Sequence, residues 1–182
     1  MKYFLDTEFI EDGKTIDLIS IGIVSEDNRS LYLVNSECDW NNASPWVLEN
    51  VLNPMGIDRV GVFNRMGFES PQLMSPTHRE QYNAQRTRSQ IRDAVLKFIA
   101  AGPGKPEFWG YYCDYDWVVF CQLFGTMMEL PKGYPMYMND LKQLLMSKGN
   151  PLQQKDDRHN ALTDAYWIRD CYESVTFPAT QG

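Results

Sequence analysis

Apolar positions in this chain alternate with polar ones near its start and recur at helical spacing further along. The first forty residues predict three strands, because short apolar or β-branched runs are separated there by polar turns. The predicted strands cover residues 2–6, 17–24 and 30–34. Ser44 and Pro45 are typical of the start of a helix, which we expect to end near Leu52. The predicted sheet therefore begins with these N-terminal strands.

The rest of the chain predicts helices alternating with strands. Residues 53–85 contain several glycines and prolines without a sustained period, which indicates loops and short helical turns. From Thr87, residues Ile91, Val95 and Ile99 share one helical face, and the Gly-Pro-Gly at 102–104 ends that helix. Further strands are predicted at 107–111 and 136–138, and further helices at 116–124, 140–146 and 161–175. This order predicts an α/β fold with a central mixed β-sheet flanked by helices.

The size and composition favour one compact globular domain spanning residues 1–182. Hydrophobic residues make up 43% of the 182 positions and charged residues 23%, which is typical of a globular protein. Asp6 interrupts the first apolar run, so that run is neither a signal-peptide core nor a membrane span. We therefore expect a cytoplasmic protein that does not contact a membrane.

Cysteine spacing and net charge limit the kinds of metal site and binding surface that this protein can have. The four cysteines are widely spaced and form no CxxC pair, which argues against a zinc ribbon and a disulfide framework. They are Cys38, Cys113, Cys121 and Cys171. A formal net charge of −7 argues against binding nucleic acid mainly through a large basic surface. This net charge is compatible with a nuclease, because bound cations offset the negative charge of an acidic site.

Two acidic motifs are candidate metal sites. Asp6 and Glu8 come at the end of the first predicted strand, where alternation places both on one side. They could share a hard cation, although acids at a strand end are more often solvated turn residues. Asp114 and Asp116 stand before an apolar helix. Helix capping is the simpler explanation, but it accounts for one aspartate better than for two.

A third motif pairs His159, at the entrance of the last predicted helix, with Asp164 inside that helix. A single histidine in a loop is more often a surface residue than a catalyst. Asp164 is less easily explained as structural, because aspartate is a poor former of helix interiors. Together, the three motifs provide several acids and one histidine.

The order and positions of these motifs resemble the DEDDh exonucleases, the superfamily of RNase T and the proofreading exonucleases. The matching features are Asp6 and Glu8 in the first strand, the strand at 18–24, the Tyr115-Asp116 pair before a helix, and His159 with Asp164. Residues 116–125 look closest to the short stand-alone RNase T-like exoribonucleases. Many relatives carry His-Asn before the second-motif aspartate, whereas this chain does not. Asp114 is therefore a rival to Asp116, which we favour because Tyr115 precedes it.

The resemblance implies an RNase H-like fold and a 3′-to-5′ exonuclease that uses two divalent cations, Mg²⁺ or Mn²⁺. Asp6 would bridge both cations, Glu8 and Asp164 would complete the site on the nucleophile side, and Asp116 would hold the other cation through water. His159 would take the proton from the attacking water. The products would be nucleoside 5′-monophosphates.

The substrate implied is single-stranded nucleic acid or a 3′ overhang, with RNA favoured over DNA. Candidate nucleic-acid-binding residues are Thr7, Phe9, Trp109, Tyr112 and Trp117, with Tyr111 as a further aromatic, although most aromatics at such positions belong to a core. A cationic cluster of Arg79, Arg86, Arg88 and Arg92 is either a phosphate track or a solvated helical face. A DNA exonuclease of the same mechanism and a non-catalytic nucleic-acid-binding module are the alternatives. Relatives are often homodimers, so a homodimer is also expected.

Overall fold

The computed structural model describes residues 1–57, 76–149 and 159–177. Its six-stranded sheet has the order β4-β3-β2-β1-β5-β6. The strands are β1 (Lys2–Glu11), β2 (Ile16–Ser25), β3 (Ser30–Asn35), β4 (Gln85–Arg86), β5 (Glu107–Gly110) and β6 (Asn139–Asp140). The first three form an antiparallel meander, and each of the others pairs in parallel with its neighbour in the sheet. The predicted mixed sheet is confirmed.

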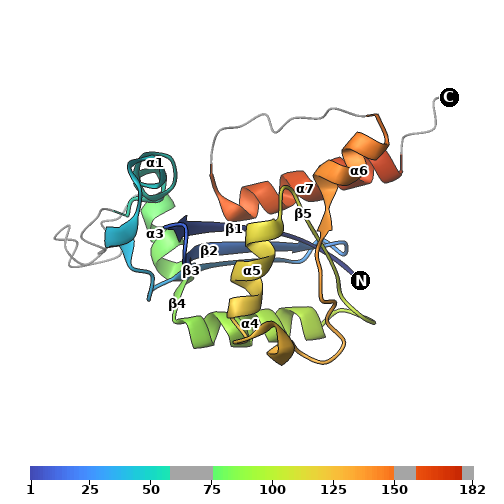
Figure 1. Ribbon diagram of the computed structural model, residues 1–182, viewed down its shortest axis with the longest axis horizontal. Helices are drawn as coiled ribbons and strands as arrows, with labels where there is room; N and C mark the ends of the chain where they lie inside the picture. Colours follow the sequence, from blue (N-terminus) through green and yellow to red (C-terminus); the bar gives the residue numbers. More distant parts are fainter. Residues whose placement is uncertain (58–75, 150–158, 178–182) are drawn as a thin grey trace.

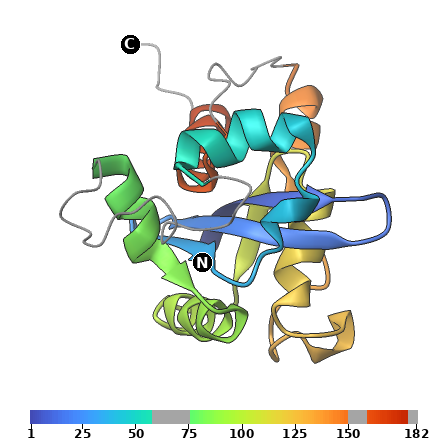
Figure 2. The ribbon, with the colours of Figure 1, turned by 90° about the vertical axis from the view of Figure 1, so that its left-hand side faces the viewer.

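Helices cover both faces of this sheet (Figures 1 and 2). On one face lie α4 (Arg88–Ala100) and α5 (Asp114–Gln122). On the other lie α6 (Leu141–Ser147), α7 (Ala161–Thr176) and a helical run composed of α1 (Pro45–Val47), the π-helical turn η2 (Leu48–Leu52) and α2 (Asn53–Met55). The remaining helical segments are η1 (Trp40–Asn42), α3 (Pro76–Ala84) and η4 (Met127–Glu129). The arrangement is the predicted α/β fold.

Alternating residues of β1 contribute to different cores. Tyr3 and Leu5 belong to the apolar cluster that β1 shares with α4 and α5. Phe4 packs in a second cluster with α6 and α7, and Ile10 in a third with the helical run. Because side chains alternate across a strand, Asp6 and Glu8 share the face of Phe4 and Ile10. The two acids are thus flanked by buried apolar packing.

Several element boundaries differ from the sequence prediction. β1 extends to Glu11, so Asp6 and Glu8 lie inside a strand and not at its end. Pairing with β2 continues along this stretch and overrides the weak strand propensity of the acids. The segment 76–84 forms the helix α3, where loops and short turns were expected. Residues 58–75 of that expectation lie outside the described residues.

Two later elements are shifted along the chain. α5 begins at Asp114, two residues earlier than predicted, because both aspartates fit the first turn of a helix. The last strand is Asn139–Asp140 and not 136–138, and it pairs with the end of β5. The four cysteines are free and buried. Among the described helices, none combines the length and apolar character needed to cross a membrane.

Candidate active site

The site forms where β1 extends past β5. The parallel pairing with β5 covers only residues 2–4 of β1, so the following residues have no strand partner on that side among the residues that the structure describes. Asp116, in the first turn of α5, occupies this position: its Oδ1 accepts hydrogen bonds from Thr7 N–H at 2.8 Å and Thr7 Oγ1 at 2.6 Å. Asp116 is therefore fixed to the strand that carries Asp6 and Glu8.

The start of α7 approaches β1 from the other face because Gly22 leaves room for it. Gly22 pairs with Asp6, and a Cβ atom there would lie 2.2 Å from the carbonyl oxygen of Ala161. Asn160 caps α7 with its side chain, and its backbone N–H donates to Asp164 Oδ2 at 3.3 Å. This close approach places Asp164 beside Asp6.

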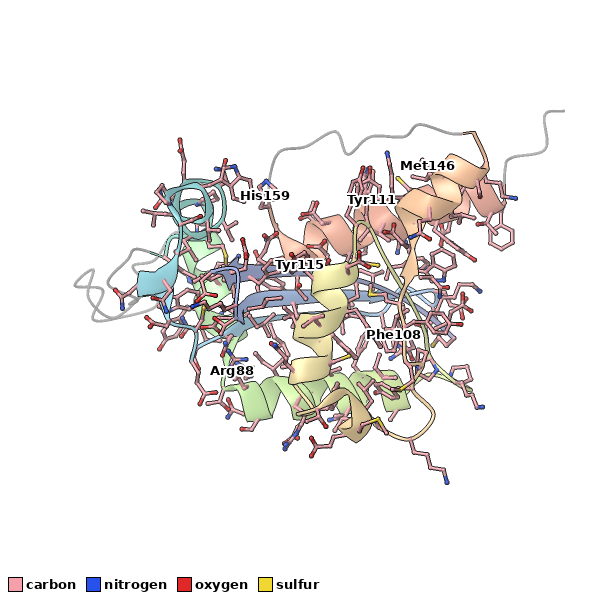
Figure 3. All side chains as sticks on the ribbon, in the orientation of Figure 1. Arg88, Phe108, Tyr111, Tyr115, Met146 and His159 are labelled. Carbon is pink, nitrogen blue, oxygen red and sulfur yellow. The ribbon has the colours of Figure 1, made fainter. Side chains whose placement is uncertain are left out.

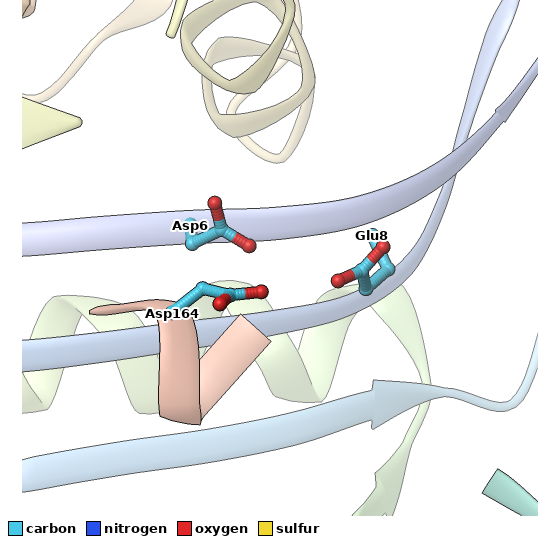
Figure 4. A group of neighbouring side chains, drawn as sticks. All are labelled: Asp6, Glu8 and Asp164. Carbon is cyan, nitrogen blue, oxygen red and sulfur yellow. The ribbon is translucent and has the colours of Figure 1, made fainter. Parts of the chain in front are cut away.

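Three carboxylates consequently converge. Asp6, Glu8 and Asp164 each offer an oxygen, and these oxygens lie within 4.8 Å of one another. Figure 4 shows the three side chains directed toward a common point between β1 and α7. Glu8 and Asp164 are buried, whereas Asp6 is half-buried. Asp116 is also buried and lines the same cavity of about 390 Å³.

Burial and mutual repulsion make these acids hard to ionise together. Burial is the largest cause that raises the pKa of Asp6 well above its usual range, and the charges of Asp116, Glu8 and Asp164 raise it further. The pKa of Glu8 is raised in the same way, by burial and then by Asp164 and Asp116. Burial raises the pKa of Asp116 to about 6, against the lowering effect of its hydrogen bonds from Thr7.

The donor set fits a divalent cation. Mg²⁺ and Mn²⁺ prefer oxygen ligands, and the cavity is lined by five carboxylates: those of Asp6, Glu8, Asp116 and Asp164, and that of Glu11, which is exposed. No lysine or arginine lines the cavity among the residues that the structure describes. A bound cation would supply the positive charge that the cluster lacks, and it would favour the ionised form of each acid.

His159 stands at the edge of this cavity, directly before α7 (Figure 3). It is half-buried, and its ring lies 4.7 Å, centroid to centroid, from that of Trp46 in an edge-on arrangement. Trp46 belongs to the first turn of α1 and also lines the cavity. Sequence reasoning missed Trp46, because no local pattern shows that α1 meets the start of α7.

The predicted nucleic-acid-binding residues divide into two groups. Phe9 lines the cavity and stacks on Tyr115, with ring centroids 5.9 Å apart and planes inclined by 17°. Thr7 also lines it, buried in its contact with Asp116. Tyr112 is 63% exposed and lies beside Tyr111, which does line the cavity.

The two tryptophans of that set pack elsewhere. Trp117 is buried in the core that β1 shares with α4 and α5, stacked on Phe120. Trp109 packs against Tyr172, and its indole N–H donates to Glu107. Neither lines the cavity, because β5 and α5 turn these side chains toward the interior.

The arginine cluster lies outside the cavity lining. Arg88 forms an ion pair with Asp17 at the start of α4, and Figure 3 shows it far from His159. Arg92 pairs with its neighbour Asp93, and Arg86 donates to backbone carbonyl groups nearby. Arg79 does not line the cavity either. These local partners favour a structural role for Arg86, Arg88 and Arg92.

Comparisons with known proteins give relatives of similar length. Two Mycobacterium tuberculosis proteins, the 3′-5′ exoribonucleases Rv2179c of strain H37Rv and MT2234.1 of strain CDC 1551, are each 39% identical over 168 residues. That match covers 91% of this chain and 87% of each relative. The solved structure of S. pombe Pop2p in its Mg²⁺- and Mn²⁺-bound form has a TM-score of 0.58 at 14% identity, covering 95% of this chain and 82% of Pop2p. No family model matches the sequence.

Proposed function

The chain belongs to the 3′-5′ exoribonuclease family represented by these mycobacterial relatives, and on that premise we propose that its carboxylate cavity hydrolyses the terminal phosphodiester of single-stranded RNA. The observation that carries the proposal is the convergence of Asp6, Glu8 and Asp164, with Asp116 on the same cavity. Cleavage would start at a free 3′ end and release nucleoside 5′-monophosphates.

The carboxylates would act by holding divalent cations. Two such cations, Mg²⁺ or Mn²⁺, would supply the positive charge that stabilises the attacking and leaving oxygens of a phosphodiester. The charges of Asp116, Glu8 and Asp164 all act on Asp6, which makes Asp6 the candidate that would contact both cations. Glu8 and Asp164 would complete one site, and Asp116 would serve the other through water. The Mg²⁺- and Mn²⁺-bound form of Pop2p supports this choice of ions.

His159 would accept the proton of the attacking water. It lines the cavity yet stands outside α7, so its ring can reach a water held near the carboxylates. As a base it must be neutral, which imidazole achieves near neutral pH. The carboxylates are not available for this task, because each would be occupied as a ligand.

Aromatic side chains at the cavity would hold the terminal nucleotide. Phe9 and Trp46 line it from β1 and α1. Stacking of bases on aromatic rings is tolerant of sequence and suits a single strand. The names of the relatives favour RNA over DNA. A homodimer and a cytoplasmic location stay predictions.

The proposal is tested with single strands of RNA and DNA labelled at the 5′ end, incubated side by side with Mg²⁺ or Mn²⁺. We expect the RNA to shorten stepwise from its 3′ end, and chromatography to identify nucleoside 5′-monophosphates. A 3′-phosphate should block the reaction. Cleavage of a circular strand would contradict an exonuclease, and faster loss of DNA would identify the alternative substrate. Binding without any cleavage would identify a non-catalytic module.

A further inference from the structure

A cluster of two tyrosines and a lysine adjoins the carboxylate cavity. Tyr111 follows β5 and lines the cavity, where its ring meets Trp167 edge-on at 4.9 Å between centroids. Its ring also contacts that of Tyr112, at 4.7 Å between centroids. Figure 3 shows Tyr111 at the α7 side of the site, in the direction of α6. Tyr111 thus connects the cavity wall to the surface outside it.

Tyr112 has a backbone conformation that its own packing does not explain. Its φ of +53° lies in the left-handed region, which bulky side chains rarely adopt. Its side chain is 63% exposed, so burial of the ring does not offset the cost of this conformation. Such strain often marks a position where orientation serves a function. Here it holds an aromatic ring at the surface beside the cavity.

Lys142 brings a positive charge to the same place. It lies in the first turn of α6, and its Nζ is 5.9 Å from the ring centroid of Tyr111 and 5.6 Å from that of Tyr112. Its backbone N–H donates to Asp140 Oδ1 at 2.6 Å, which fixes the start of the helix. In the part of the chain that the structure describes, no carboxylate forms an ion pair with its Nζ.

We propose that Tyr111, Tyr112 and Lys142 form a subsite for the nucleotide immediately upstream of the scissile bond. The inference rests on the proposed function. Lys142 would contact a backbone phosphate of the single strand, and the exposed ring of Tyr112 would stack on a base. Charge supports this occupant, because a strand approaching a protein of net charge −7 and a cavity lined by five carboxylates needs a cation near its entrance.

The subsite acts only on substrates longer than one nucleotide. We therefore compare a short oligoribonucleotide with the p-nitrophenyl ester of a nucleoside 5′-phosphate, whose single phosphate is the one cleaved. Tyr112→Ala should raise KM for the oligonucleotide by about 5- to 150-fold, the range for losing one stacked base. Lys142→Ala should also raise KM and reduce the slope of log affinity against log salt by about 0.7, as for one phosphate contact. Neither change should alter hydrolysis of the small ester.

Control variants distinguish the effect of the charge at Lys142 from the effect of any positive charge on α6. Lys148→Ala removes an exposed lysine from the other end of the same helix and should leave both substrates unaffected. Lys142→Arg should retain most of the oligonucleotide affinity. The melting temperature of Lys142→Ala should equal that of the wild type.

Affinity for the oligonucleotide is also measured by fluorescence anisotropy in the Asp164→Asn background, which separates binding from cleavage. A wild type that hydrolyses neither substrate would refute the proposed function, while binding that depends on Lys142 would still support the subsite. The subsite is refuted if Lys142→Ala and Tyr112→Ala impair both substrates equally, or if oligonucleotide affinity is unchanged in both variants.

Discussion

The two halves of β1 differ in what surrounds them. Tyr3 and Phe4 pair with β2 on one side and β5 on the other, and their neighbourhood is apolar core. Within the part of the chain that the structure describes, residues 6–8 have β2 alone as a strand partner, and here the second side is occupied by Asp116 of α5. The first half stabilises the fold through burial. The second half concentrates charge, so the site forms where the sheet leaves one edge of a strand uncovered.

The largest effect should come from removing one charge in the second half. Asp6→Asn or Asp164→Asn keeps the side-chain shape but removes one of the charges that we propose to hold the cations, so we expect turnover to fall to background. Each variant should melt at the wild-type temperature or above it, because one source of repulsion is gone. Near-wild-type cleavage by either folded variant would exclude that residue from the reaction.

The two aspartates of α5 differ in their position relative to β1, so their substitutions should differ in effect. Asp116 is buried at the uncovered edge of β1, whereas Asp114 is exposed and does not line the cavity. Asp116→Asn should therefore reduce single-turnover cleavage far more than Asp114→Asn, which serves as its control. If Asp114→Asn proved the more damaging, the role would belong to Asp114.

His159 should matter for rate but not for cation binding. His159→Ala removes the proposed proton acceptor, and we expect single-turnover cleavage to slow by about 10²–10⁴-fold. Calorimetric titration with Mn²⁺ should give the wild-type affinity. A loss of Mn²⁺ affinity would make His159 a ligand, and an unchanged rate would make it structural.

Two substitutions near the site, one in β1 and one in β2, distinguish loss of core packing from displacement of a site residue. Leu5→Ala should destabilise the fold by about 2–5 kcal/mol, while the folded fraction cleaves normally.

Gly22→Ala places a methyl group against Ala161 and should destabilise the fold by about 1–3 kcal/mol. It should also slow the folded protein, because it displaces the start of α7. Chemical denaturation and initial rates test both, and equal specific activities would contradict the role of Gly22.

The smallest effect concerns pH. The pKa of Asp116 is about 6 in the folded protein, and those of Asp6 and Glu8 are raised as well. Stability from these protonated acids is present below the pKa of about 4 in the unfolded chain and is lost as pH rises through their folded values. The cation-free protein should therefore melt at a lower temperature near pH 8 than near pH 5. Asp116→Asn should show a smaller fall, and an increase in melting temperature would contradict the assignment.

Local patterns in the sequence made the acids and the histidine candidates only, and the resemblance to the DEDDh exonucleases selected among them. The structure brings the selected residues to one cavity, and their roles stay predictions. The sequence also predicted the mixed sheet and α7 closely. It did not predict that β1 reaches Glu11, because pairing with β2 decides this. Trp46 and Gly22 depend on contacts with the start of α7, more than a hundred residues away, and left no local signal. Trp117 belongs to the core, as most aromatics at such positions do.

Under the proposed function, the carboxylate cavity works through divalent cations. The most direct measurement is the rate of cleavage of 5′-labelled single-stranded RNA in excess Mg²⁺, then in excess chelator, then with Mg²⁺ restored. We expect cleavage in the first state, none in the second and recovery in the third, because the four acids supply no positive charge to stabilise the reacting phosphate unless a divalent cation is bound. Sustained cleavage in excess chelator would contradict it.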